Sequence, residues 1–487
     1  MTAAVPPEHI PVLVIGGGVG GLVTALSLAR AGHRPVVVEA ADSCGGVLSG
    51  HRVGGLTLDA GAESFATARP SVTELLTELG LAARITAPNP AGAWVRHRGG
   101  SAPLPAMALL GIPGRPWAAD VRRVIGVAGI ARAALDAVLP GRAGLPAGST
   151  LGAVVRSRMG ARVLDLLVEP VTGGVYAADP DRLDVSTVAP TLDRALRDTG
   201  SLAGAVRLLR GGGERAGSAV ATLTGGLHTL VPALAWAVRA AGGEVRTGTG
   251  VTGLRQIDPG WQVRVTGGGE IHAGAVVVAV PAPTAAELLA TTLVAPLALP
   301  VLNAPIAPVL ICTLVVDDPR LDTAPRGTGV LVSAHAQGVQ AKALTHATAK
   351  WPWLADAAGP GRHVLRLSYG RGGTLPSENG LTDVALADAG ELLGLRIAAS
   401  SVIDSAVVRW TSALPAPRPG HADAVRTLRA ALRPLRLAIV GASVAGSGLA
   451  GVVADATLQA SCLVADLDAV SGIAGGEPPA TPGPARR

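Results

Sequence analysis

The chain has 487 residues, of which 48% are hydrophobic and 2% aromatic, and its formal net charge is +6. This length suits two or three domains with a large buried core. Proline or arginine interrupts the apolar runs before they reach the roughly 20 residues of a membrane-spanning helix, which argues against an integral membrane protein. The arginines are scattered singly, and no basic run is interleaved with aromatic residues, so we expect no nucleic-acid binding.

The positive charge comes from arginine, because Lys342 and Lys350 are the only lysines. This balance fits a solvated arginine surface or an anionic small substrate. Cys44, Cys312 and Cys462 form no CxxC pair, and so few cysteines fit a reducing compartment. The N-terminal apolar run lacks a basic flank, so we predict no signal peptide and a cytoplasmic location. The histidines have no metal-ligand spacing, and we predict no metal site.

The first elements in the chain form a βαβ unit. The pattern predicts a buried strand at 12–15, a helix at 22–32 that stops at a glycine, and a second strand at 35–40. A glycine-rich loop, GGGVGG at 16–21, connects the first strand to the helix. Such a loop places backbone amides at a helix N-terminus, where phosphate binds.

The loop matches the pattern G-x-G-x-x-G at Gly16, Gly18 and Gly21. Gly16 allows the tight turn, Gly18 lets the backbone approach a pyrophosphate, and Gly21 lets helix and strand pack closely. Glu39 ends the second strand, where a carboxylate can accept hydrogen bonds from both ribose hydroxyls. The sequence therefore predicts a dinucleotide site that uses an unphosphorylated ribose.

Later segments alternate between helix and strand patterns. In chain order we expect helices at 104–139 with breaks at Pro113 and Pro116, further helices at 151–210, a helix ending at Gly242, a strand pair up to 256, a hairpin and buried strand at 261–281, alternating strands and turns at 300–410, and a strand from Leu437 to Val440. That last strand runs into a second glycine-rich loop, GASVAGSGLAG at 441–451, with few residues after it.

Two motifs after Glu39 identify the kind of dinucleotide. EAADSCGGVLSG places the pair Gly45 and Gly46 just after the acidic residue, and GLTLDAGAESF follows at 55–65. This arrangement resembles the flavin amine oxidase superfamily, which includes protoporphyrinogen oxidases, phytoene desaturases and monoamine oxidases. The resemblance implies FAD. Many members carry an arginine before the glycine pair, where this chain has Ser43 and Cys44.

The resemblance also implies the fold. It is an α/β fold with a Rossmann-like FAD-binding domain of the GR2 type, a mixed-sheet substrate domain and a helical subdomain. The expected boundaries are 1–88, 215–285 and 404–470 for the discontinuous FAD-binding domain, 89–214 for a helical subdomain at the substrate entrance, 286–403 for the substrate-binding domain, and 471–487 for a disordered tail.

In the superfamily the chain leaves the FAD domain and returns to complete the cofactor site, which explains the second glycine loop. Val251 is expected near the adenine, Gly441 near the phosphates, and the amides of Leu449 and Ala450 near the pyrimidine edge of the flavin. The full set implied for FAD is Gly16, Gly17, Gly18, Val19, Gly20, Gly21, Glu39, Ala40, Gly45, Gly46, Val47, Gly61, Ala62, Glu63, Ser64, Val251, Gly441, Gly448, Leu449 and Ala450.

Motifs in the middle of the chain resemble one branch of the superfamily. The segment at 167–187, with GVYAADP at 174–180, is similar to protoporphyrinogen and coproporphyrinogen III oxidases. This implies FAD-dependent, O2-using oxidation of a porphyrinogen to a porphyrin in haem biosynthesis, in three two-electron steps that release H2O2. The substrate is coproporphyrinogen III or protoporphyrinogen IX, with the former favoured. The resemblance implies no general base, so the catalytic residues stay unknown.

The propionates and flat body of such a substrate need a few arginines and apolar or aromatic walls. The candidates are Arg69, Arg96, Arg98, Tyr176 and Tyr369. At most peripheral membrane contact and a transient contact with a ferrochelatase are expected. Two alternatives remain open: another oxidase or desaturase of the superfamily, and a non-catalytic paralogue that binds FAD or porphyrin. An amine oxidase would need an aromatic cage near the C-terminus, where this chain has Val444 and Ala445.

Overall fold

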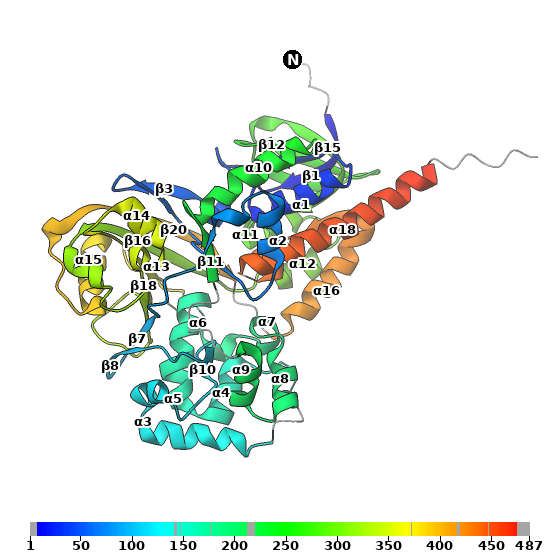
Figure 1. Ribbon diagram of the computed structural model, residues 1–487. Coiled ribbons are helices and arrows are strands. Elements are labelled where there is room, and N and C mark those ends of the chain that lie inside the picture. Colours follow the sequence, from blue (N-terminus) through cyan, green and yellow to red (C-terminus); the bar gives the residue numbers. More distant parts are fainter. Residues whose placement is uncertain are drawn as a thin grey trace, which may run out of the picture.

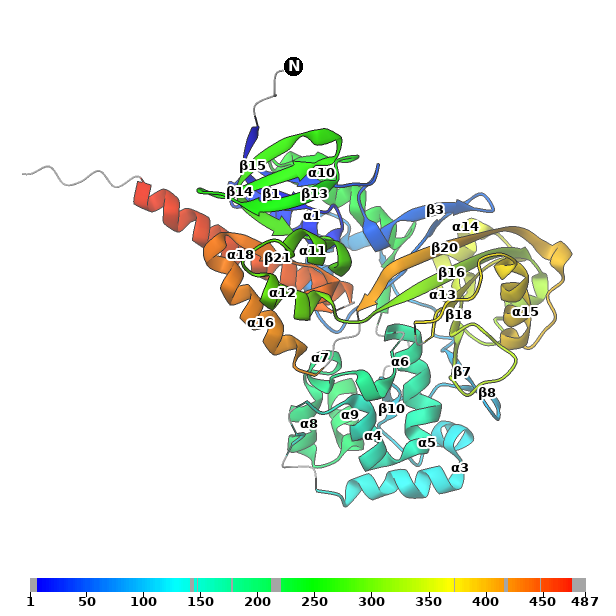
Figure 2. The same ribbon diagram turned by 180° about the vertical axis from the view of Figure 1, so that it is seen from behind.

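The computed structural model describes residues 7–140, 144–146, 148–176, 178–211, 220–371, 373–415, 419–446 and 448–474. Figure 1 shows three regions: a sheet with flanking helices at the top, a second sheet at the left and a group of helices at the bottom. Figure 2 shows the same arrangement from behind. The α/β class predicted from the sequence is confirmed.

The first sheet joins strands that lie far apart in the chain. Its order is β12-β2-β1-β15-β14-β13, and β21 pairs with β15. The strands are β1 (Glu8–Ile15), β2 (Pro35–Val38), β12 (Glu244–Arg246), β13 (Val251–Gln256), β14 (Trp261–Val265), β15 (Glu270–Val278) and β21 (Leu437–Ile439). β12, β2, β1, β15 and β21 run parallel, whereas β13 and β14 form an antiparallel extension.

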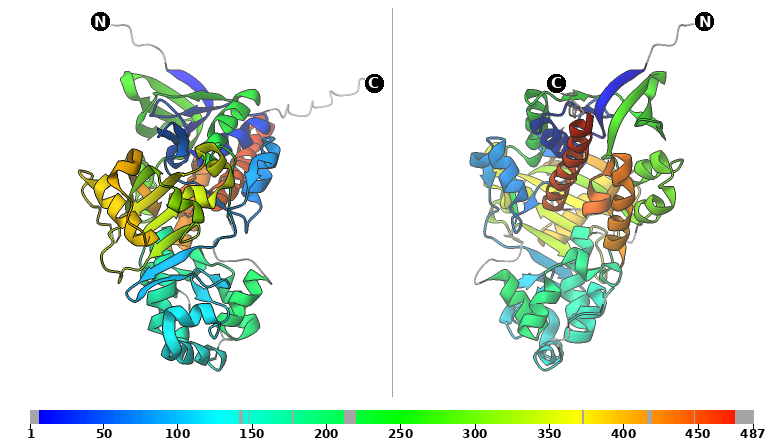
Figure 3. Two further views of the ribbon diagram at one scale, coloured as in Figure 1. Left: turned by 60° about the vertical axis from the view of Figure 1, so that its left-hand side comes forward. Right: turned by 90° about the vertical axis from the view of Figure 1, so that its right-hand side faces the viewer.

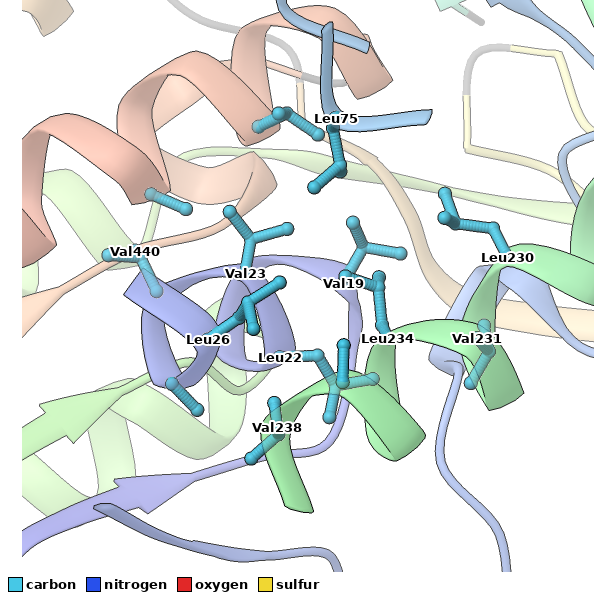
Figure 4. Packing of buried hydrophobic residues seen from close by; sticks show 14 of the residues in the cluster. Val19, Leu22, Val23, Leu26, Leu75, Leu230, Val231, Leu234, Val238 and Val440 are labelled. Atoms are coloured by element: carbon cyan, nitrogen blue, oxygen red, sulfur yellow. The ribbon is translucent and has the colours of Figure 1, made fainter. Parts of the chain in front are cut away.

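Apolar residues on both faces explain why β1 lies at the centre. Val12, Leu13 and Val14 are fully buried, as expected for a parallel strand covered on both sides. Three helices cover one face: α1 (Val19–Arg30), α10 (Leu230–Ala240) and α18 (Leu449–Ala474). Figure 4 shows Leu22 and Val23 of α1 packed among side chains from these elements. Each such buried leucine or valine contributes about 1.5–3 kcal/mol to folding.

The second sheet has the order β20-β16-β19-β18-β17-β7-β8. Its strands are β7 (Trp94–His97), β8 (Gly100–Pro103), β16 (Ile306–Asp317), β17 (Gly329–Val332), β18 (Ala343–His346), β19 (Arg362–Tyr369) and β20 (Val402–Pro415). Helix α15 (Leu381–Leu393) packs on one face. This differs from the predicted boundaries, which place β7 and β8 in the helical subdomain and most of β20 in the FAD domain. The pattern within a strand does not encode which distant strand it pairs with.

The lower region contains α3 (Ala119–Ala134), α4 (Leu151–Met159), α5 (Ala161–Val163), α6 (Glu169–Tyr176), α7 (Val185–Val188), α8 (Leu192–Thr199) and α9 (Leu202–Arg210). Its core is separate from those of the two sheets. The helix predicted from residue 104 is wrong over 104–118. That stretch instead carries a hairpin of β9 (Ala108–Leu109) and β10 (Ile112–Pro113), with positive φ at Leu110 and Gly111 in the turn. Prolines in this segment remove amide donors that a helix needs.

The remaining elements pack around these regions, and Figure 3 shows the molecule from two further sides. They are β3 (Gly50–Val53), β4 (Leu56–Asp59), β5 (Phe65–Ala66), α2 (Ser71–Glu78), β6 (Ile85–Thr86), β11 (Val220–Leu223), α11 (Ala282–Leu289), α12 (Ala295–Leu302), α13 (Ala347–Lys350), α14 (Pro352–Ala358), α16 (His421–Leu432) and α17 (Ala442–Ala445). α11 and α12 share a core with the first sheet, although most of their residues fall in the predicted substrate domain.

Helix α18 extends to Ala474, four residues into the range predicted for the tail, and 475–487 lie outside the described residues. Contrary to the expectation from the sequence, its segment Leu449–Ala469 contains no proline or arginine and is long and apolar enough to span a membrane. In the most apolar window of this segment, 33% is buried inside the protein. This helix packs against α1 and α2.

Candidate functional site

The first glycine loop has little space at two of its glycines. Gly16 has φ +109°, and a Cβ there would lie 2.5 Å from the carbonyl oxygen of Ala279. A Cβ on Gly21 would lie 2.0 Å from the carbonyl oxygen of Gly16. The Gly16 amide donates to the Val38 carbonyl at 2.8 Å, which ties the turn between β1 and α1 to the end of β2. Only glycine fits these two positions, whatever the loop binds.

Other glycines of the predicted site face open space. A Cβ on Gly18 would meet no atom within 4 Å, and the same holds for Gly441 and Gly448. Gly18 precedes α1, and no side chain caps the amides of the first turn of this helix. Gly45 donates to the Gly17 carbonyl at 3.0 Å, so the second glycine pair lies beside the first loop. Open space beside uncapped helix amides is suited to a pyrophosphate.

The two glycine-rich loops meet although more than 400 residues separate them in the chain. A Cβ on Gly20 would lie 3.4 Å from the Cα of Gly441. The start of α18, with Leu449 and Ala450, lies against the start of α2, because the Ser71 hydroxyl donates to the Ala450 carbonyl at 2.8 Å. The helix N-terminus at Leu449 provides a second group of backbone amides and a positive dipole end.

Glu39 lies at the end of β2, as predicted, and its carboxylate faces the first loop. Its two oxygens accept from the Gly17 amide at 2.7 Å and from the Ala41 amide at 2.9 Å. The Glu39 carbonyl accepts from Thr249, so the start of β13, with Val251, lies close to Glu39 and Ala40. The parts predicted for the ribose and the adenine therefore come together.

Cys44 lies beside this loop, at the position where many members of the superfamily carry an arginine. A Cβ on Gly17 would lie 2.6 Å from its Sγ. Burial and the nearby Glu39 carboxylate raise the pKa of the Cys44 thiol, so the group is uncharged at neutral pH. The thiol fills space beside the loop without supplying the positive charge of an arginine.

The loop predicted to lie against the flavin, residues 59–64, is fixed by contacts from three directions. The Ala62 amide donates to the Val47 carbonyl at 3.0 Å. Trp410 on β20 donates to the Ala60 carbonyl at 3.2 Å, and Arg366 on β19 donates to the Gly61 carbonyl at 2.7 Å. The second sheet therefore holds the loop that is predicted to belong to the FAD site, and Ser64 lies in the same loop.

Glu63 is the charged centre of that loop. Its oxygens accept from Lys350 Nζ at 2.7 Å and from Arg366 Nη1 at 2.5 Å. Burial opposes the charge, but the two cations outweigh it and lower the pKa of the Glu63 carboxyl to about 2. Sequence reasoning missed Lys350 and Arg366. Two signals could have found them: Lys350 is one of only two lysines, and Arg366 interrupts the apolar strand HVLRLSY.

The five substrate candidates lie on different elements of the structure. Arg69 lies exposed before α2, and Arg98 lies exposed in the turn between β7 and β8. Arg96 forms an ion pair at 2.6 Å with Glu391 on α15. The side chain of Tyr176, at the end of α6, lies outside what the structure describes.

Tyr369 does not face the flavin loop, which corrects its prediction as a substrate contact. It is fully buried in the core under α15, and its hydroxyl donates to Asp388 at 3.2 Å. Side chains alternate between the faces of a strand, so Tyr369 lies on the face opposite Arg366 in β19. The hydrophobic environment and the Asp388 carboxylate raise the pKa of the tyrosine.

Comparisons with known proteins identify the family. Residues 19–466 match the family described as flavin containing amine oxidoreductase. The chain is 32% identical over 465 residues to the coproporphyrinogen III oxidase of Mycobacterium tuberculosis (strain ATCC 25618 / H37Rv), covering 94% of this chain and 98% of that protein. It is 26% identical to the coproporphyrinogen III oxidase of Bacillus subtilis (strain 168), covering 93% of this chain and 97% of that protein.

Solved structures show the same fold. A crystal structure from Exiguobacterium sp. 255-15, assigned as a protoporphyrinogen oxidase, has a TM-score of 0.81 at 24% identity and covers 95% of this chain and 100% of that one. A putrescine oxidase bound to putrescine has a TM-score of 0.64 at 15% identity, again covering 95% and 100%. The lower TM-score and identity set the putrescine oxidase further from this chain.

Proposed function

Because this chain belongs to the flavin-containing amine oxidoreductases, and within them to the coproporphyrinogen III oxidases, we propose that it oxidises coproporphyrinogen III to coproporphyrin III. The chain is an FAD-dependent oxidoreductase. In the proposed reaction, three two-electron steps each pass hydrogen from the macrocycle to the flavin and release H2O2 from O2; protoporphyrinogen IX is a second, poorer substrate. The observation that carries the proposal is the meeting of the two glycine loops around open space.

The residues of the site fit FAD. The glycines at 18, 46 and 441 and the N-terminus of α1 would hold the pyrophosphate, and Glu39 would hold a ribose. When bound, the flavin supplies hydride acceptance and reaction with O2. Glu63, fixed by Lys350 and Arg366, would orient the loop against the flavin. The amides that begin α18 would stabilise negative charge at the pyrimidine edge.

The substrate's carboxylates need cations on the substrate side, and Arg69 and Arg98 remain candidates because their guanidinium groups are accessible. We further propose a cytoplasmic location, which the three free cysteines support. Contact with a membrane is at most peripheral, and the porphyrin product passes to a ferrochelatase through transient contact. A porphyrin is poorly suited to free diffusion in water, which favours such a transfer.

The proposed function is tested by anaerobic mixing of purified protein with coproporphyrinogen III. We expect the yellow flavin absorbance to bleach and to return when O2 is admitted, with three H2O2 formed per porphyrin. We also expect kcat/KM to be higher for coproporphyrinogen III than for protoporphyrinogen IX under one buffer and salt condition.

Two outcomes would contradict the proposal. Absence of bleaching in protein loaded with FAD would indicate a non-catalytic paralogue. Equal or reversed kcat/KM values would remove the preference for the substrate with four carboxylates.

A further inference from the structure

Lys342 is buried without a counter-charge. Only 2% of this residue is exposed, and its Nζ has no hydrogen-bond partner within the described part of the chain. Its backbone is fixed beside β17 and β19, since its amide donates to the Ser368 carbonyl at 2.8 Å and its carbonyl accepts from Val332 at 3.0 Å. An ammonium group in such a place is costly unless an anion compensates its charge.

Arg371, two residues after β19, and Lys342 both contact the backbone of Val332: the Arg371 guanidinium donates to the Val332 carbonyl, and the Lys342 carbonyl accepts from the Val332 amide. Burial, together with the positive charge of Arg371, lowers the pKa of Lys342 to about 8. Arg371 donates to Glu169 at 2.8 Å and to the Val332 carbonyl at 2.7 Å, yet 32% of its side chain stays exposed. The guanidinium therefore has donors left for a further acceptor.

Glu169 does not neutralise both cations. One of its oxygens accepts from Arg371, and the other accepts from the Ala334 amide at 2.9 Å. The group formed by Lys342, Arg371 and Glu169 contains two cations and one carboxylate, so its net charge is +1. One additional carboxylate would bring it to neutrality.

The group lies where the lower helical region meets the second sheet. Glu169 begins α6, which contacts β17. Figures 1 and 2 show α6 at the end of the lower region that faces the second sheet. Lys342 directly precedes β18, and Arg371 follows the end of β19. A Cβ on Gly173 of α6 would lie 3.3 Å from Arg371 Nη1, so the helix has a glycine where the guanidinium approaches. Arg366, which binds the loop at 59–64, lies in β19, and the last residue of this strand, Tyr369, is two residues before Arg371.

We propose that Arg371 and Lys342 form a carboxylate subsite for one propionate of the porphyrinogen, an inference that rests on the proposed function. Arg371 donates to the carboxylate from its exposed part, and the buried ammonium of Lys342 supplies the second positive charge. The macrocycle then lies toward Arg366 and the flavin loop. The use of lysine fits this role in a chain whose 41 basic residues include only two lysines, because a compact ammonium occupies a space that a planar guanidinium does not.

The key variant is Lys342→Met, tested in the FAD-loaded protein by fluorescence titration with coproporphyrin III, the stable oxidised form. Methionine has a similar length, and no hydrogen bond is lost. If Lys342 has only a structural role, we therefore expect Lys342→Met to have an unchanged or higher Tm and unchanged porphyrin binding. The subsite predicts an unchanged or higher Tm and an increase of about tenfold in the Kd for coproporphyrin III.

Two controls separate charge at the subsite from other effects. Arg34→Met removes one exposed positive charge from the FAD domain and should leave the Kd unchanged. Coproporphyrin III tetramethyl ester, which has no carboxylates, should bind wild type and Lys342→Met equally.

A Kd for coproporphyrin III within twofold of wild type in folded Lys342→Met would overturn the subsite, as would an equal loss of ester binding. Wild-type protein that binds coproporphyrin III but shows no flavin bleaching would contradict the proposed function while the Lys342 effect still supports the subsite. Wild-type protein that binds no coproporphyrin III would overturn both.

Discussion

At the scale of single residues, Gly18 offers a test of the cofactor site that does not disturb folding. Its φ of −70° and ψ of 174° are allowed for any residue, and a Cβ there would meet no atom within 4 Å. We expect Gly18→Val to fold but to purify colourless, because the branched side chain occupies the space for the pyrophosphate. Visible absorbance and released FAD measure the loading. Ala31→Val, at the other end of α1, should stay yellow, and a fully loaded Gly18→Val would contradict the site.

Glu63 gives a second residue-scale prediction, on pH. The pKa of this carboxyl is about 2 in the folded protein and 4.5 ordinarily, so its charged form stabilises the fold above pH 4.5. This stabilisation is lost as the pH falls from 4.5 through 2, where the group is protonated in both states. Glu63→Gln should therefore lower the free energy of unfolding at neutral pH by about 3 kcal/mol, and less as the pH approaches about 3.

Thermal or urea unfolding of wild type and Glu63→Gln across this pH range measures the difference. A difference that is constant with pH would show that the Glu63 charge does not contribute to stability.

At the scale of elements, one buried carboxylate joins helices of the lower region. Asp136 accepts from Arg158 Nε at 2.6 Å and from the Leu202 and Ala203 amides that begin α9 at 3.0 and 2.8 Å. Asp136→Asn leaves the Arg158 cation buried without its counter-charge, and we expect a loss of about 3–5 kcal/mol. Faster limited proteolysis within 119–210, with FAD still bound, would report this local loss.

An exposed ion pair in the same region provides the control. Arg194 and Asp198 lie 4.0 Å apart on α8, with 88% and 57% of their side chains exposed. Asp198→Asn should change stability by less than about 1 kcal/mol. Equal proteolysis of the two variants would contradict the role of Asp136 in fixing α9.

At the scale of the whole molecule, the surface of the lower region bears on membrane contact. Val121, Val124 and Ile125 of α3 are buried in the core of this region, whereas Trp117, Val127 and Val138 are 63%, 74% and 78% exposed. Arg122 and Arg123 are also exposed. The buried residues of α3 therefore pack inside the protein. The exposed apolar residues near this helix, with Arg122 and Arg123 beside them, form a smaller surface that could contact a membrane.

We therefore expect the protein to stay in the supernatant after lysis without detergent and to bind anionic vesicles weakly, in a salt-sensitive way. Liposome flotation at low and high salt measures this. Near-complete flotation that resists salt would instead indicate an anchor in the bilayer.

The sequence by itself determined the features that depend on neighbouring residues. The βαβ unit, the turn at Gly16 and the position of Glu39 follow from hydrophobic period and glycine spacing over about 30 residues. The motifs around Gly45 and 174–180 indicated the family on the same local basis. These interactions form within one short segment, so the segment contains the information that specifies them.

Tertiary structure alone decided which distant segments meet. Glu63 pairs with Lys350 and Arg366 across 287 and 303 residues, and β7 joins a sheet built mainly from residues after 300. Alternation along β19 puts Tyr369 and Arg366 on opposite faces, but packing decides which face α15 covers and which face meets the loop at 59–64. In each case the contact is chosen by packing against a partner far along the chain, and no local period or spacing records that partner.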